Sequence, residues 1–328
     1  MIGNRRPKNI SWVMVMTIAF AAALISSGQQ PVAGRILTAK RMTNVIDSYP
    51  MLSPDGKKIA FQSNRTGNRE IFVMNFDGTA LSQLTNNDWY DGTPVWSPDG
   101  HRIVFTSSPN GDTEIFVMNA NGTEKRRLTN SPGDDSHPKW SPDGSRIIFN
   151  SARTTQDLTV EWVKQVHEIF TMRADGTDVK QITALKTVST YPSFSPDGRE
   201  IVFRSIVSTP GFIWDLSASP RNSDILVMNS EGGSPRNVTN NAAFDGWGAW
   251  SPDGKQILFS SNRAGPANIG QLYRVNPDGS DLQQLTAGPG SFVQASWSRD
   301  GTKILAQQHW ETEEFGNLVI FEMRSLRE

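Results

Sequence analysis

The chain repeats one arrangement of apolar and polar positions six times along its length. In the copy at 93–105, an apolar stretch ends in Trp96, a polar turn follows at 97–100, and a β-branched stretch closes the unit. The turn reads Ser-Pro-Asp-Gly, in which proline presets φ at the second position and glycine tolerates positive φ at the last. Two strands joined by such a turn pair as a hairpin, so the pattern predicts six β-hairpins.

The spacing of the turns predicts the architecture. They follow one another at intervals of 44, 44, 54, 56 and 47 residues, and begin at Ser53, Ser97, Ser141, Ser195, Ser251 and Ser298. Periods of about 40 to 50 residues with several short strands are typical of β-propeller blades, which bury their faces against neighbouring blades. The sequence therefore predicts an all-β fold, a six-bladed β-propeller.

Each repeat continues in the same order beyond its hairpin. A polar loop leads to a third apolar strand, such as 115–118, and a polar strand ending in Leu-Thr closes the unit, as at 126–129. Four antiparallel strands make one blade. The aromatic and methionine residues at fixed positions of the repeat are interpreted as packing between blades.

The two ends of the repeat region complement each other. The sixth repeat stops after 318–321 without a polar fourth strand, whereas residues 35–43 match a fourth strand and precede the first blade. We expect residues 35–43 to complete the last blade, so that the ring is closed three-plus-one and leaves no open sheet edge. The predicted propeller spans 35–328.

The amino-terminal residues 1–33 have the order of a secretory signal. Arg5, Arg6 and Lys8 precede an apolar run at 10–25, and small residues follow at 26–28. The run is shorter than the roughly 20 residues that a membrane span needs. We expect cleavage near Gly28 and a soluble, monomeric, periplasmic or secreted protein without membrane contact; the alternative is an uncleaved anchor.

Composition excludes some classes of function. Cysteine is absent, so neither disulfides nor a thiolate metal site can form. The net charge is −1, and 1–33 contains three basic and no acidic residues, which leaves −4 for the remaining chain. A mildly acidic domain lacks the basic surface that nucleic-acid binding requires. No nucleic-acid partner is expected.

Several repeated motifs resemble the WD-like propeller repeat of the TolB family. They are the aromatic-Ser-Pro-Asp-Gly turn, the Ser-Asn-Arg-x-Gly-Asn loop at 63–68, the Ile-Phe-Val-Met strand at 71–74 and the Leu-Thr-Asn ending at 84–86. The resemblance covers 35–328 and implies a periplasmic role in the Tol–Pal envelope system, with a peptidoglycan-associated lipoprotein as partner. In that family an α/β domain precedes the propeller; the pattern here predicts none.

Related propeller repeats also occur in serine peptidases of the prolyl oligopeptidase type. Those enzymes need a Gly-x-Ser-x-Gly elbow on an α/β-hydrolase domain to expose the nucleophile. The nearest segments here, 232–236 and 288–291, lack that spacing. The sequence therefore argues against peptidase activity, and no catalytic residue is assigned.

Four aspartates occupy one position of the repeat, at the entry to an inner strand: Asp47, Asp91, Asp135 and Asp245. Inner strands line the central channel, so these carboxylates are expected around one mouth of it. Two interpretations stay open. Each Asp hydrogen-bonds the backbone of its own turn, or together they form a cation site, for example for calcium, or a socket for a partner's basic group.

Two neighbouring blades carry long insertions between their second and third strands. The insertion at 152–167 contains Trp162, and the insertion at 205–223 contains Phe212 and Trp214. Both are expected on the face that holds the four aspartates. Either these aromatic residues pin the loops to the rim, or they form a hydrophobic wall beside the acidic mouth, where a few aromatic side chains would dominate affinity.

The sequence favours an exported, non-enzymatic, TolB-like scaffold in the cell envelope that binds a protein or peptide. The predicted binding residues are the four aspartates with Trp162, Phe212 and Trp214. The alternative, from another class, is a metal-dependent hydrolase or lyase with an ion at the central channel.

Overall fold

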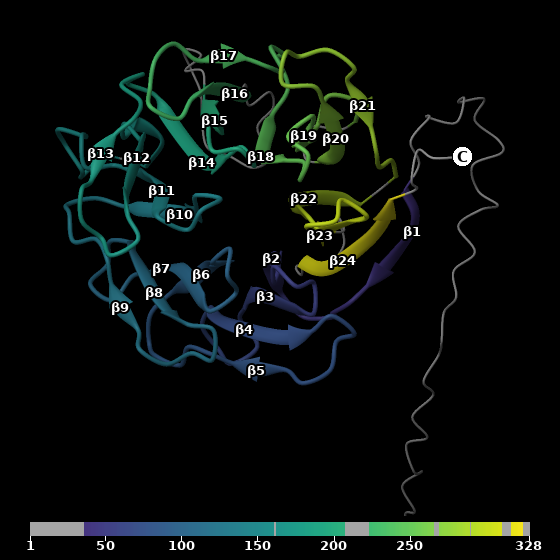
Figure 1. Ribbon diagram of the computed structural model, residues 1–328, viewed down its shortest axis with the longest axis horizontal. Helices are drawn as coiled ribbons and strands as arrows, with labels where there is room; N and C mark the ends of the chain where they lie inside the picture. Colours follow the sequence, from purple (N-terminus) through teal and green to yellow (C-terminus); the bar gives the residue numbers. More distant parts are fainter. Residues whose placement is uncertain are drawn as a thin grey trace, which may run out of the picture. The chain divides into compact units, whose positions relative to one another are not determined.

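The computed structural model describes residues 36–160, 162–206, 223–265, 269–288, 290–309 and 316–323. In these ranges 24 strands form six antiparallel sheets of four strands each, arranged as blades around a common centre (Figure 1). The all-β, six-bladed prediction is confirmed. The proposed signal, 1–33, lies outside the described residues. Within the described part, no helix is long and apolar enough to cross a membrane.

The four strands of each blade run from the centre outward (Figure 1). Innermost are β2 (Asp47–Leu52), β6 (Asp91–Trp96), β10 (Asp135–Trp140), β14 (Val188–Phe194), β18 (Asp245–Trp250) and β22 (Ser291–Trp297). Second are β3 (Lys58–Ser63), β7 (Arg102–Ser107), β11 (Arg146–Ser151), β15 (Glu200–Ile206), β19 (Ile257–Ser261) and β23 (Lys303–His309). Third are β4 (Glu70–Asn75), β8 (Glu114–Asn119), β12 (Glu168–Arg173), β16 (Ser223–Asn229), β20 (Gln271–Val275) and β24 (Gly316–Met323). Outermost are β5 (Ser82–Gln83), β9 (Arg126–Arg127), β13 (Lys180–Gln181), β17 (Arg236–Asn237), β21 (Gln283–Gln284) and β1 (Ile36–Arg41).

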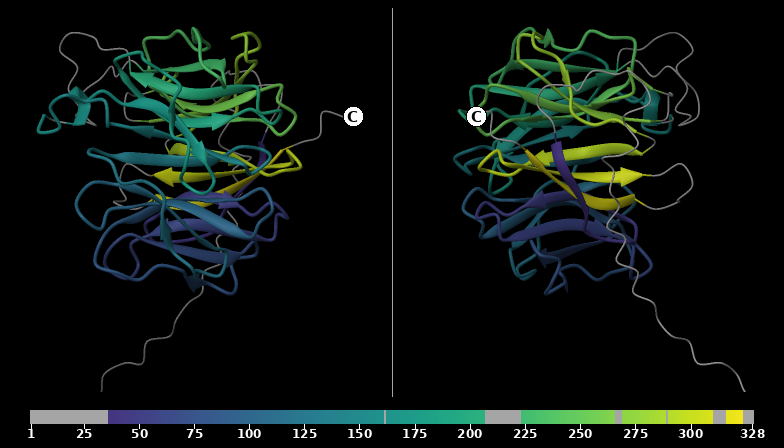
Figure 2. Two further views of the ribbon diagram at one scale, coloured as in Figure 1. Left: turned by 60° about the vertical axis from the view of Figure 1, so that its left-hand side comes forward. Right: turned by 90° about the vertical axis from the view of Figure 1, so that its right-hand side faces the viewer.

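The last blade is completed by the first strand of the chain. β1 pairs antiparallel with β24, with Arg41 opposite Val319, and Met42 N donates to Leu318 O at 2.7 Å (Figure 2). The sheet order is β1-β24-β23-β22. Three-plus-one closure is confirmed, and it covers the edge that β24 would otherwise present.

The hydrophobic core is divided among the interfaces between blades. Among the described residues it forms six clusters, and each cluster joins side chains of two successive blades. The inner-strand tryptophans also cross these interfaces: Trp96 Nε1 donates to Met51 O, and Trp140 Nε1 to Val95 O, both at 3.2 Å. The interpretation of the repeated aromatic positions as inter-blade packing is confirmed.

The Ser-Pro-Asp-Gly turns are held by their own side chains. In the second blade, Ser97 Oγ and His101 N both donate to Asp99 Oδ1, and Gly100 has a φ of +74°. The hydrogen bond from Ser97 holds the pKa of Asp99 below its usual value. These aspartates are therefore structural, and the glycine is required by the left-handed conformation.

Candidate functional site

The four aspartates at the entry to inner strands are buried and do not form an exposed acidic ring. Asp47, Asp135 and Asp245 have no exposed surface, and Asp91 is 1% exposed. All four begin their strands on the same face, because each is the first residue of an inner strand. In the fifth blade, an arginine holds the carboxylate in this position.

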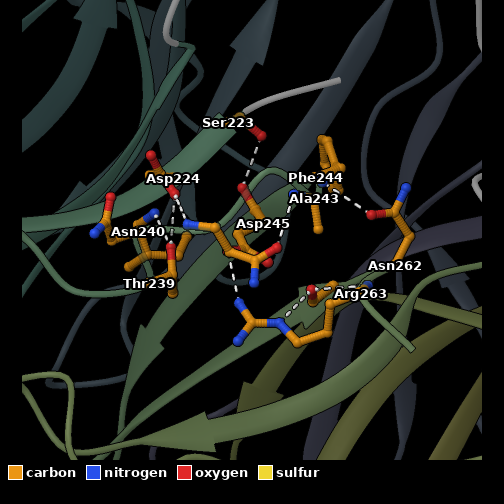
Figure 3. Close-up of polar contacts among 12 residues, drawn as sticks. Ser223, Asp224, Thr239, Asn240, Ala243, Phe244, Asp245, Asn262 and Arg263 are labelled. Carbon is orange, nitrogen blue, oxygen red and sulfur yellow. Dashed lines mark hydrogen bonds and ion pairs between the residues drawn. The ribbon is translucent and has the colours of Figure 1, made fainter. Parts of the chain in front are cut away.

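Asp245 is paired with an arginine of its own blade (Figure 3). Arg263 Nη2 donates to Asp245 Oδ2 at 2.7 Å, and its Nε donates to Ser261 Oγ at 2.9 Å. The guanidinium also lies 5.2 Å from the ring centroids of Phe259 and Tyr273. A planar cation on aromatic faces with a carboxylate at its edge is a favourable geometry for arginine.

The same arrangement recurs in the first and third blades, and we call it the arginine site. Each arginine site consists of a buried aspartate, a serine, two rings and an arginine 18 residues after the aspartate. In the first blade these are Asp47, Ser63, Phe61, Phe72 and Arg65, and in the third Asp135, Ser151, Phe149, Phe170 and Arg153.

Burial dominates the electrostatics of Asp135 and Asp245. It raises the pKa of Asp135 to about 6 although the nearby Arg153 lowers it, and it raises the pKa of Asp245 as well. Within the described ranges, no group of three or more His, Asp or Glu residues is placed to hold a metal ion. The buried, paired carboxylates act as anchors for the loops of their own blades.

The centre of the ring is occupied by one residue from each inner strand. These residues have left-handed φ angles of 50° to 55° and lie where the pairing of inner and second strands shifts register: Tyr49, Thr93, His137, Tyr191, Trp247 and Gln294. At the bulge, five of these side chains contact other blades, whereas Thr93 Oγ1 lies 2.7 Å from Thr106 Oγ1 of its own blade.

The central side chains contact one another across the ring. Tyr49 and Tyr191, from the first and fourth blades, place their hydroxyl oxygens 3.2 Å apart. The rings of His137 and Tyr191 have centroids 3.8 Å apart, and Trp247 meets Tyr191 edge-on at 5.8 Å. Burial lowers the pKa of His137 to about 3, so the imidazole is neutral. Its Nδ1 lies 2.8 Å from Asn150 Oδ1.

Sequence reasoning missed this central cluster. Its members lie two residues after the aspartate position, so their repetition was visible in the sequence. Tyr, Thr, His, Trp and Gln share no chemistry at that position, however. The left-handed backbone that directs them inward is not a preference of these residue types.

Trp162 lies beside a cavity between the second and third blades. The insertion folds back as a short 3₁₀ helix, Trp162–Lys164, and the Trp162 ring packs on buried His167 with centroids 4.5 Å apart. The cavity has a volume of about 330 Å³ and is lined by Tyr90, Thr93, Thr106, Ser108, Thr113, Asp134, Ser136, His137 and Trp162. Hydroxyl groups, the three rings of Tyr90, His137 and Trp162, and one carboxylate make up this lining.

Hydrogen bonds beside the cavity show on which face the loops between second and third strands lie. Thr113 comes from the loop between the second and third strands of its blade, and donates from N and Oγ1 to Asp134 Oδ1, directly before β10. Loops of this type therefore lie on the face where inner strands begin, as expected. Phe212 and Trp214 lie outside the described residues.

Family models match the propeller in two parts. Residues 34–112 and 86–161 match the TolB beta propeller domain, and residues 163–316 match the Tricorn protease N-terminal beta propeller domain. Together with the six-bladed ring, these matches identify the repeat. This chain is a TolB-like β-propeller.

Similar proteins share the TolB-like propeller over part of their length. The Tol-Pal system protein TolB of Anaeromyxobacter dehalogenans is 30% identical over 130 residues, which are 40% of this chain and 26% of that protein. The crystal structure of TolB from Acinetobacter baumannii has a TM-score of 0.60 at 24% identity, over 74% of this chain and 55% of the other. The chain thus matches only part of these relatives.

An enzyme shares the same fold. The structure of an oligogalacturonate lyase in complex with manganese has a TM-score of 0.59 at 14% identity, over 90% of this chain and 97% of the lyase. At this identity the likeness concerns the fold alone.

Proposed function

We propose that this TolB-like propeller is an exported, non-enzymatic scaffold that binds a segment of a partner protein in the cell envelope. The observation that supports it is the cavity beside Trp162, on the face where the inner strands begin. A partly exposed tryptophan next to hydroxyl groups and a carboxylate combines an apolar anchor with polar contacts that fix orientation.

This surface suits a peptide that binds on one face of the propeller better than a chain that passes through the central channel. Side chains that meet across the ring, such as Tyr49 and Tyr191, occupy its centre, so the partner would bind on one face. The resemblance to Tol-Pal system TolB proteins makes a peptidoglycan-associated lipoprotein the first partner to test, and it supports the proposal that the protein acts in the periplasm.

The experiment is a titration of the purified propeller with a purified peptidoglycan-associated lipoprotein. We expect saturable binding, and a loss of about tenfold or more in affinity for Trp162→Ala, the size typical of a hot-spot aromatic residue. The control is Leu282→Ala, which removes an exposed apolar side chain of the fifth blade outside the cavity lining. Unchanged affinity for Trp162→Ala combined with a lower melting temperature would assign Trp162 to the support of its own loop.

A further inference from the structure

The second blade contains an arginine site without an arginine. Asp91, Ser107 and the rings of Phe105 and Phe116 occupy the positions that form the site in the first, third and fifth blades. Where those blades have arginine, the second blade has Pro109.

The loop that carries Pro109 follows the same path as its counterpart in the first blade. The segments 107–114 and 63–70 have equal length, from the serine of the site to the glutamate that opens the third strand. Ser108 N donates to Tyr90 O at 3.0 Å, and the equivalent Asn64 N donates to Ile46 O at 3.4 Å. Pro109 therefore stands at the position of Arg65.

Asp91 remains buried although its cation is missing. Its Oδ2 accepts a hydrogen bond from Asn87 Nδ2 at 2.7 Å. Its Oδ1 is buried without a hydrogen-bond partner, as are Asp135 Oδ1 and Asp245 Oδ1 in the filled sites, so the difference lies in the missing cation. Among the described residues, no Lys, Arg or His forms an ion pair with it. In the other three sites the aspartate accepts from a guanidinium at 2.7 to 2.9 Å. A buried carboxylate without a cation is costly.

Both rings of the site are in place; Phe105 is buried, and only Phe116 is left partly exposed. The centroids of Phe105 and Phe116 are 5.7 Å apart, within the range of 5.7 to 6.1 Å in the three filled sites. Phe116 is only half-buried, whereas its counterparts Phe72, Phe170 and Tyr273, each covered by a guanidinium, are 3% to 5% exposed.

Trp89 makes one of the contacts that arginine makes elsewhere. Its Nε1 donates to Ser107 Oγ at 3.1 Å, where Arg65, Arg153 and Arg263 donate from Nε at 2.8 to 2.9 Å. The indole has one neutral donor, which is used on the serine, so it supplies no charge to Asp91. It is 41% exposed and lies at the surface of the site.

We propose that the arginine site of the second blade binds an arginine side chain supplied by a partner protein. The side chains of Arg65, Arg153 and Arg263 are 11% to 21% exposed, so a filled site reaches the surface and a guanidinium can enter from outside. Tyr90 and Ser108, beside the site, also line the cavity at Trp162, so one segment could use both. Lysine lacks the planar fork and the ring stacking. The origin of the arginine in a partner rests on the proposed function; the binding of a guanidinium does not.

The test uses N-acetylarginine amide as the probe and the ¹⁵N-labelled propeller. The NMR signal of the Trp89 indole N–H is assigned by its loss in Trp89→Phe. It should shift with added probe until the site is saturated, because the guanidinium replaces the indole as the hydrogen-bond donor to Ser107 Oγ. N-acetyllysine amide should bind at least about tenfold more weakly. Asp91→Asn should abolish the shift, as should Pro109→Arg, which fills the site from within. Pro109→Ala is the matched control and should retain binding.

A variant with a second vacated site calibrates the experiment. Arg153→Ala empties the arginine site of the third blade and should bind a second equivalent of probe. If the wild-type protein shows no saturable shift, the proposal is wrong, whether Arg153→Ala binds the probe or not. If the probe binds but Asp91→Asn leaves the affinity for the lipoprotein unchanged, its assignment to that partner is wrong. A failure of Trp162→Ala to weaken partner binding would contradict the proposed function without affecting this titration.

Discussion

At the scale of single residues, burial decides which groups carry charge. His167 has no exposed surface, and neither ring nitrogen has a hydrogen-bond partner among the described residues. Burial lowers its pKa to about 4, although nearby Asp134 raises it. The neutral imidazole packs on Trp162, so the protonation state of one residue is linked to the loop that carries the proposed binding surface.

His167 should make the propeller less stable in acid. Between pH 6.5 and 4 the unfolded state gains a proton at this residue and the folded state does not, so the free energy of unfolding falls as pH is lowered. The full contribution is roughly 3 kcal/mol. Denaturant unfolding across this range should show a smaller fall for His167→Phe than for wild type. His101→Gln, at an exposed turn, is the control; equal slopes for His167→Phe and wild type would contradict the assignment.

At the scale of elements, each blade has one face on each neighbour, and the ring depends on its closing strand. β1 is far from β24 in sequence and is the outermost strand of the last blade. Leu318 and Ile320 of β24 belong to the cluster shared with the first blade, so loosening of β24 would also disturb the interface on that side.

Removal of the closing strand should destabilise the whole ring. A chain that starts at residue 45 lacks β1, and we compare it with a chain that starts at residue 35. Several ladder hydrogen bonds of about 1 kcal/mol each are lost, so we expect a loss of roughly 3 kcal/mol or more and association through the free edge of β24. Thermal melting and light scattering measure both effects. Equal melting temperatures and a monomeric short chain would show that β1 is dispensable.

At the scale of the whole molecule, the cluster at the centre joins the first blade to the third and fourth, which are not its neighbours, and also joins successive blades. Tyr191 of the fourth blade meets Tyr49 of the first and His137 of the third. Gln294 Oε1 of the last blade accepts from Tyr49 N at 3.0 Å. These contacts add cross-links to a ring otherwise held by successive interfaces.

Two substitutions of Tyr191 separate the hydroxyl contact from the packing of the ring. Tyr191→Phe removes the contact with Tyr49 and should cost about 1 kcal/mol. Tyr191→Ala also removes the stacking on His137 and leaves a cavity, for a loss of roughly 3 kcal/mol. Urea unfolding followed by circular dichroism checks both. Equal losses for the two variants would mean that packing at the centre contributes little.

The repeat by itself determined the number of blades, the strands in each and the closing partner of the last blade. Turn chemistry and the spacing of the apolar strands are local properties, and the missing fourth strand at one end matches the surplus strand at the other. The structural role of the turn aspartates, such as Asp99, was predictable for the same reason.

Only the tertiary structure decided what the repeated positions do. Asp47, Asp91, Asp135 and Asp245 look alike in the sequence, yet the fold pairs three of them with an arginine from a loop 18 residues away. Asp91 stays without one because Pro109 stands at that position. The residues at the centre meet only because the ring brings separate blades together. A linear pattern specifies which residues recur; the distances between blades, and hence the central cluster and the cavity at Trp162, arise when the ring closes.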